Sequence, residues 1–153
     1  MKLVSTWKEK MLFTAEAGGQ SALMDAKPPI GTGAALTPKE LLAAAACGCT
    51  GMDVIALLRK HKQPVEDFEI EADVATSAGG NPVVFDGMTL TYRLGGPVDP
   101  ARALEAVTLS QTKYCGVGAM LAKAFPIRYE VFLNGEKIGA GTANFTETKE
   151  KQA

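Results

Sequence analysis

The sequence has few of the residues on which metal sites, disulfide frameworks and electrostatic docking surfaces depend. Its 153 residues include one histidine and three cysteines. With no histidine cluster and no Cys-x-x-Cys pair, the sequence indicates no metal or cofactor site. Three cysteines are too few for a disulfide framework and indicate reduced thiols, some of them reactive. Sixteen basic and seventeen acidic residues form no long block of one sign, so we expect neither nucleic acid nor a membrane surface as partner.

The chain also has no segment typical of export. Residues 1–8 alternate polar and apolar side chains instead of presenting the basic segment and apolar run of a signal peptide. The longest apolar stretch, 41–58, contains Asp53 and two glycines and is at the short limit for spanning a bilayer, so we expect a buried core helix. The composition predicts one cytoplasmic domain over 1–153, with a frayed polar end at 146–153.

Strand and helix patterns follow one another in separate groups. Alternating polar and apolar residues predict strands at 2–8, 11–16, 20–26, 68–75, 82–94 and 127–133. Capping signals and apolar runs predict helices at 38–61, 99–112 and 117–125, the second of them capped by Asp99. Strands, a helix, strands and then helices form an α+β pattern, with a first meander and a later hairpin that are both antiparallel.

The first predicted helix contains two of the three cysteines. Thr37 and Glu40 form a capping box at its start. At about 100° per residue, Cys47 and Cys49 point in different directions and cannot bond to each other within the helix. Only Cys49 shares an i, i+4 row with an ionisable residue, Asp53.

Small side chains surround Cys49 in the sequence, which allows another backbone or a ligand to approach the helix closely. Tight packing against another helix explains the same pattern, and a buried cysteine is often only a small hydrophobe. Cys115 favours a reactive pair, because it precedes a predicted helix. The N–H groups at a helix start stabilise a thiolate, so we expect a lowered pKa for Cys115, with Lys113 adding to the effect.

Two segments carry a resemblance to a known family. Residues 38–55, with Cys49 eleven residues beyond Pro38, and residues 113–121, with Cys115, resemble the OsmC/Ohr family of thiol-dependent hydroperoxide reductases, within it the YhfA-like subgroup. The resemblance covers nearly the whole chain in its order of elements. It implies an OsmC-like fold, with antiparallel sheets around a long central helix, and an intertwined homodimer with active sites where the subunits meet.

The resemblance also implies roles for the cysteines. Cys49 matches the peroxidatic cysteine, which a hydroperoxide oxidises to a sulfenic acid, and Cys115 matches the resolving cysteine, which then forms a disulfide with it. A dithiol reductant restores both thiols, and no cofactor or metal is implied. Cys47 has no counterpart and is expected to be structural.

Some positions depart from the family pattern. The family's arginine and its glutamate after the helix-start proline correspond to Gln20 and Lys39. Asp53 and Glu40 are the carboxylates left as candidate supporting residues, while the lone His61, at the basic end of the helix, is expected to serve only the helix terminus. Two functions therefore stay open: a peroxidase, or a non-catalytic protein of the same fold that binds a small hydrophobic molecule or senses oxidation.

Overall fold

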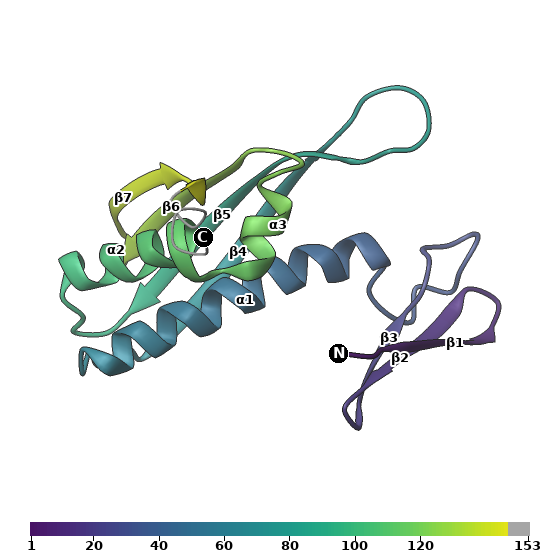
Figure 1. The fold of residues 1–153 in the computed structure, drawn as a ribbon, viewed down its shortest axis with the longest axis horizontal. Coiled ribbons are helices and arrows are strands. Elements are labelled where there is room, and N and C mark those ends of the chain that lie inside the picture. Colours follow the sequence, from purple (N-terminus) through teal and green to yellow (C-terminus); the bar gives the residue numbers. More distant parts are fainter. Residues whose placement is uncertain (147–153) are drawn as a thin grey trace, which may run out of the picture. The chain divides into compact units, whose positions relative to one another are not determined.

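The computed structural model describes residues 1–146, and the predicted frayed end lies outside the described residues except for Thr146. Figure 1 shows the helices and strands in chain order. Their bounds are β1 Val4–Glu9, β2 Leu12–Ala17, β3 Gln20–Met24, α1 Pro38–Lys60, β4 Asp67–Thr76, β5 Phe85–Gly95, α2 Pro100–Leu109, the π-helix η1 Ser110–Tyr114, α3 Gly116–Leu121, β6 Ile127–Leu133 and β7 Glu136–Thr142. The chain forms two compact units, 1–44 and the part that begins at Ala45.

The N-terminal unit is the predicted antiparallel meander, with strands in the order β1-β2-β3. Asp25 follows β3 and closes the loop behind it. Its carboxylate accepts hydrogen bonds from the Thr32 hydroxyl (2.6 Å) and from the N–H groups of Ala26, Thr32 and Ala34. The bond from Thr32 contributes most to lowering the pKa of Asp25 to about 2, and the backbone donors add to it.

The start of α1 also belongs to this unit and has the predicted capping box. The N–H of Thr37 donates to the Glu40 carboxylate over 2.7 Å, and the N–H of Glu40 donates back to the Thr37 hydroxyl over 3.3 Å. Lys27 lies 3.1 Å from the other oxygen of the same carboxylate. These contacts stabilise the first turn of α1, and they lower the pKa of Glu40, with the Thr37 N–H contributing most.

The second unit contains a four-stranded sheet in the order β4-β5-β6-β7. Two neighbouring pairs are antiparallel, but β5 and β6 are parallel. The expectation of antiparallel sheets was wrong for this pair, because α2, η1 and α3 form a crossover that returns the chain in the same direction. Strand β7 was not predicted, because its glycines Gly139 and Gly141 weaken the strand pattern.

One face of this sheet forms the core. Its buried side chains alternate along the two central strands: Met88, Leu90, Tyr92 and Leu94 on β5, and Ile127, Tyr129, Val131 and Leu133 on β6. The helix α1 buries a single i, i+4 row, Ala46, Thr50, Val54 and Leu58. The prediction of a buried core helix therefore holds for one face of α1 only, since Met52 on another face is 75% exposed.

The small residues of α1 serve close packing against the sheet. A Cβ atom at Gly51 would lie 3.2 Å from Ile70 Cδ1 and 3.8 Å from Phe68 Cε1, both on β4. The sequence left open whether a helix or a ligand approaches here, and at Gly51 a strand does. Among the residues that the structure describes, α1 is the one helix whose length and composition would suit a membrane span, a test that core helices of soluble proteins also pass.

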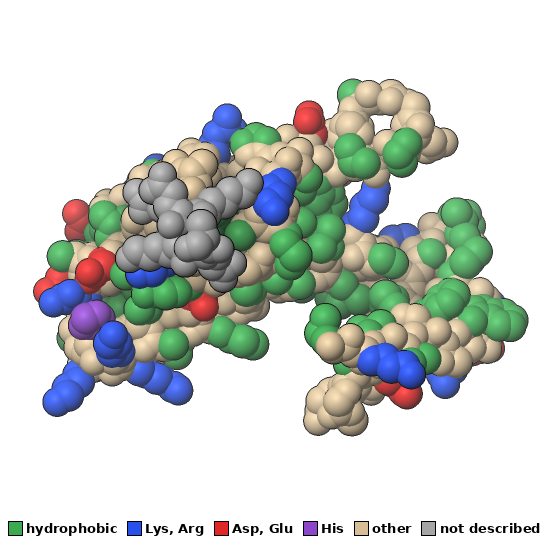
Figure 2. Space-filling view, viewed as in Figure 1, with side chains coloured by type: hydrophobic (Ala, Val, Ile, Leu, Met, Phe, Trp, Pro, Cys, Tyr) green, Lys and Arg blue, Asp and Glu red, His purple; other side chains and the backbone are tan. Residues whose placement is uncertain are grey.

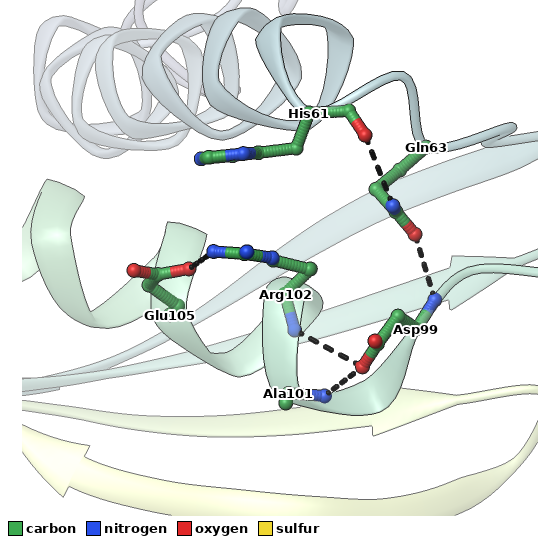
Figure 3. A network of polar contacts seen from close by, with 6 residues as sticks. All are labelled: His61, Gln63, Asp99, Ala101, Arg102 and Glu105. Atoms are coloured by element: carbon green, nitrogen blue, oxygen red, sulfur yellow. Dashed lines mark hydrogen bonds and ion pairs between the residues drawn. The ribbon is translucent and has the colours of Figure 1, made fainter.

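A chain of hydrogen bonds connects the end of α1 to the start of α2 (Figure 3). The Gln63 amide donates to the backbone carbonyl of His61 (3.1 Å) and accepts from the N–H of Asp99 (2.8 Å). The Asp99 carboxylate then accepts from the N–H groups of Ala101 and Arg102, as the predicted N-cap of α2. In Figure 3 the His61 ring points away from Gln63, and only its carbonyl joins this network.

Candidate thiol site

Three groups from two helices meet in the second unit. The sulfur atoms of Cys49 and Cys115 and a carboxylate oxygen of Asp53 all lie within 4.8 Å of one another. Cys49 and Asp53 are one turn apart on α1 and half-buried, whereas Cys115, at the start of α3, is only 1% exposed. The structure thus brings together the two predicted cysteines and one of the two predicted carboxylates. Glu40, the other, lies in the N-terminal unit in its capping box.

Cys115 occupies the N-cap position of α3, as the sequence predicted. Its sulfur accepts a hydrogen bond from the N–H of Gly118 over 3.2 Å. A Cβ atom at position 118 would lie 3.1 Å from this sulfur, so the absence of a side chain allows the close approach. The preceding π-helix ends in a bond from the N–H of Cys115 to the carbonyl of Ser110, five residues earlier. Such π-turns occur frequently at functional sites.

The expected lowering of the Cys115 pKa was wrong. Burial, followed by the hydrogen bond with Cys49 and the charges of Cys49 and Asp53, raises the pKa of Cys115 to about 12, although the Gly118 N–H acts in the opposite direction. Desolvation of a thiolate therefore outweighs the helix start. Lys113, expected to assist, has its ammonium 5.2 Å from the centre of the Tyr114 ring.

Cys47 stays outside this cluster. It lies on α1 two residues before Cys49, where the helix turns it in another direction. Burial raises the pKa of the Cys47 thiol. Its structural role remains a prediction, and the position offers a matched control for experiments on Cys49.

A buried hydrogen-bond network adjoins the thiols. The Thr50 hydroxyl lies 2.8 Å from the Tyr92 hydroxyl and 2.7 Å from the Ser110 hydroxyl. Ser110 donates to the Asp53 carboxylate over 3.0 Å. The Gln111 amide nitrogen donates to Tyr92 (2.7 Å) and Thr50 (3.1 Å). The network connects α1, β5 and the π-helix, and it ends on the carboxylate of the thiol cluster.

Counting donors fixes the direction of every bond in this network. Ser110 has one hydroxyl proton, which it gives to Asp53, so the bond between Thr50 and Ser110 has Thr50 as donor. The single proton of Thr50 is then used, so Tyr92 is the donor to Thr50. Gln111 supplies the first N–H of the series. The hydroxyls are therefore all aligned toward the Asp53 carboxylate, which this alignment holds in one orientation.

Sequence reasoning missed Tyr92, Ser110 and Gln111. The alternation of β5 already placed Tyr92 on an inward face, and this was an available signal. Ser110 and Gln111 are adjacent and both at most 1% exposed, which a regular amphipathic helix does not predict. The Gln111 side-chain carbonyl has no hydrogen-bond partner within residues 1–146.

The chain is similar in sequence and in fold to known proteins. A family model described as OsmC-like protein matches residues 31–130. Protein YhfA of Escherichia coli (strain K12) is 35% identical over 129 residues, which cover 82% of this chain and 93% of that protein. Among solved structures, a hypothetical protein from Aquifex aeolicus VF5 is 25% identical with a TM-score of 0.74, covering 87% of this chain and 96% of that one.

A further solved structure supports the fold alone. An organic hydroperoxide resistance protein OsmC from Legionella pneumophila superposes with a TM-score of 0.64 and 17% identity, covering 86% of this chain and 97% of that one. At this identity the superposition shows that the two chains share an α+β architecture.

Proposed function

This chain belongs to the OsmC-like family, and on that premise we propose that it reduces organic or inorganic hydroperoxides with its two clustered thiols. The observation that carries the proposal is the distance of at most 4.8 Å between the sulfur atoms of Cys49 and Cys115. Cys49 is half-buried and so is open to a substrate, whereas Cys115 lies behind it at 1% exposure. This arrangement supports a peroxidatic role for Cys49 and a resolving role for Cys115.

In the first step the Cys49 thiolate attacks the peroxide. A sulfur–oxygen bond forms, the O–O bond breaks, and the alcohol or water leaves after taking up a proton. The sulfur loses two electrons and becomes a sulfenic acid.

In the second step Cys115 attacks the sulfenic sulfur of Cys49. A disulfide forms, and the hydroxyl leaves as water with the proton of the Cys115 thiol. A dithiol then reduces the disulfide and is itself oxidised to a disulfide.

The test is a peroxide assay with matched cysteine variants. Reduced wild-type protein is mixed with excess cumene hydroperoxide and a dithiol, and peroxide loss is followed together with the thiol titre. Cys49→Ser is expected to consume no peroxide. Without the dithiol, Cys115→Ser is expected to react once and to hold a sulfenic acid that dimedone traps, while Cys47→Ser behaves as wild type. Unchanged peroxide with three persistent thiols in the wild type would overturn the proposal.

The proposed enzyme acts in the cytoplasm as a homodimer, without a membrane or nucleic acid as partner. Figure 2 shows hydrophobic side chains at the molecular surface. On α1, Met52 is 75% exposed and Leu42 is 42% exposed. Burying these side chains against a second copy of the chain stabilises the dimer. Light scattering after size exclusion is expected to give a dimer that Met52→Glu dissociates or weakens, and a monomeric wild type would contradict this.

A second candidate function is a non-catalytic ligand-binding or redox-sensing protein. Two observations favour it: Gln20 and Lys39 replace the residues that the family uses to activate its thiolate, and the N-terminal unit contains an apolar pocket of about 370 Å³. Met11, Phe13 and Met24 are among the side chains that line this pocket. Stoichiometric binding of a hydrophobic dye, without catalytic peroxide loss, would support this function over the first.

A further inference from the structure

We propose that the reduced thiol cluster binds a zinc ion through Cys49, Cys115 and Asp53. The two sulfur atoms and the carboxylate oxygen already lie within 4.8 Å of one another. A tetrahedral zinc site with Zn–S bonds of about 2.3 Å has its ligand atoms about 3.8 Å apart. Small side-chain rotations are therefore enough to close the three ligands around one ion. The inference does not depend on the peroxidase activity proposed above.

The ligand types select the metal. Two thiols suit Zn²⁺ and other borderline or soft cations, whereas Mg²⁺ and Ca²⁺ require oxygen ligands. When each Zn–S bond forms, the thiol releases its proton to solvent, and the two thiolates and the Asp53 carboxylate then bring three negative charges to the ion. With three protein ligands, the fourth coordination position stays open for water, as in catalytic zinc sites.

Asp53 is held in an orientation that suits a metal ligand. The Ser110 hydroxyl donates to Oδ2 of Asp53, which leaves Oδ1 without a contact from Ser110. Thr50 and Tyr92 fix the Ser110 hydroxyl through the aligned network. Hydrogen bonds to metal-ligating carboxylates commonly serve this purpose, and removing them typically costs about 10–100-fold in affinity.

The proposed ligands differ in their exposure to solvent. Cys49 and Asp53 are half-buried on α1, so an ion reaches them from solvent, while Cys115 at 1% exposure closes the inner side. The Gly118 N–H bond at 3.2 Å fixes the sulfur of Cys115 at the start of α3. No sequence motif indicates this site, because its ligands come from separate helices and have no zinc-finger spacing.

Zinc binding by the reduced full-length chain tests the inference. Under anaerobic conditions, Zn²⁺ is titrated in competition with a chromophoric chelator, and Mg²⁺ serves as the control cation. We expect one Zn²⁺ per chain and no competition from Mg²⁺. Cys49→Ser and Cys115→Ser should each weaken binding by more than about 100-fold, and Asp53→Asn and Ser110→Ala by about tenfold or more. Cys47→Ser, a neighbouring thiol outside the cluster, should change affinity less than about twofold.

Cobalt provides a readout that does not involve turnover. Co²⁺ bound to the wild type should show a thiolate-to-cobalt charge-transfer band, which Asp53→Asn retains at higher metal concentration and which the Cys49 and Cys115 variants weaken. Circular dichroism checks that each variant is folded. Absence of binding in the wild type, equal binding in Cys49→Ser, or loss of binding in Cys47→Ser would overturn the inference. A protein that binds zinc but reduces no peroxide would overturn only the proposed function.

Discussion

The Ser110 hydroxyl donates a hydrogen bond of 3.0 Å to the carboxylate of Asp53. This contact joins a fully buried set of hydroxyls to a carboxylate that is half-exposed beside two thiols. Ser110 is 0% exposed, so its hydroxyl cannot donate to solvent water instead. The orientation of Asp53 therefore depends on side chains that are buried from solvent.

Removing the Tyr92 hydroxyl should destabilise the second unit. Tyr92→Phe leaves the Gln111 amide and the Thr50 hydroxyl each without one partner in a site closed to water. An unsatisfied buried group costs about 1–3 kcal/mol, so the free energy of unfolding in urea should fall by about that amount. Tyr114→Phe, on an exposed ring, is the control and should have almost no effect. Equal stability of both variants would show that the hydrogen bonds of the Tyr92 hydroxyl do not stabilise the fold.

Two glycines of α1 should respond differently to alanine. Nothing lies within 4 Å of a Cβ atom at Gly48, so Gly48→Ala should raise the free energy of unfolding by up to about 1 kcal/mol through helix propensity. A Cβ at Gly51 would be 3.2 Å from Ile70 Cδ1. Gly51→Ala should therefore raise the free energy of unfolding by less, and Gly51→Val should lower it. Urea unfolding measures all three, and equal gains at both glycines would contradict the close packing on β4.

The N-terminal unit should lose stability in acid through Asp25. Its pKa is about 2 in the folded chain, below the ordinary value of 3.8 for an aspartate. Because the folded pKa is the lower one, the stabilisation is complete above the unfolded pKa and is lost as the pH falls from about 5 to about 2. Thermal unfolding followed across this range should show the loss in the wild type.

Two variants separate Asp25 from the other carboxylates. Asp25→Asn removes the charge that accepts four hydrogen bonds, so its melting temperature should be lower at pH 6 and depend less on pH below 5. Asp73→Asn, on an exposed position of β4, should follow the wild-type curve. An unchanged acid dependence in Asp25→Asn would show that another group is responsible.

Alkylation should modify Cys115 last among the three cysteines. Burial raises its pKa to about 12 and leaves it 1% exposed, so both thiolate fraction and access are low at pH 8. Iodoacetamide labelling of the native reduced protein, followed by peptide mass spectrometry, gives the order. In urea the three rates should converge, and faster labelling of native Cys115 than of Cys49 would contradict the assignment of roles.

The sequence predicted those features that depend on local signals. The capping box of Thr37 and Glu40, the N-cap at Asp99 and the strand at 127–133 are all confirmed. Each depends on side chains within a few residues of one another, so the chemistry is visible in the linear order. The same reasoning placed Cys115 at a helix start.

The remaining features depend on contacts between distant residues. The pKa of Cys115 was predicted in the wrong direction because burial, which only the folded chain shows, outweighs the local N–H groups. The parallel pairing of β5 with β6 and the position of Ser110 beside Asp53 likewise need the crossover that η1 completes. Cys49, Cys115 and Asp53 were thus candidates from the sequence alone, but the hydrogen bond that orients Asp53 was not.

The π-helix before Cys115 sets the direction in which the side chain of Cys115 points. Its extra residue per turn shifts the later backbone by about 100° relative to a continuous α-helix. Ser110 and Gln111 both face the buried network, and the chain still delivers Cys115 to Cys49 and Asp53. Deleting one residue within 110–114 would make the helix regular and turn the sulfur of Cys115 away. The spacing between 110 and 115 is therefore as much a part of the site as the residues it positions.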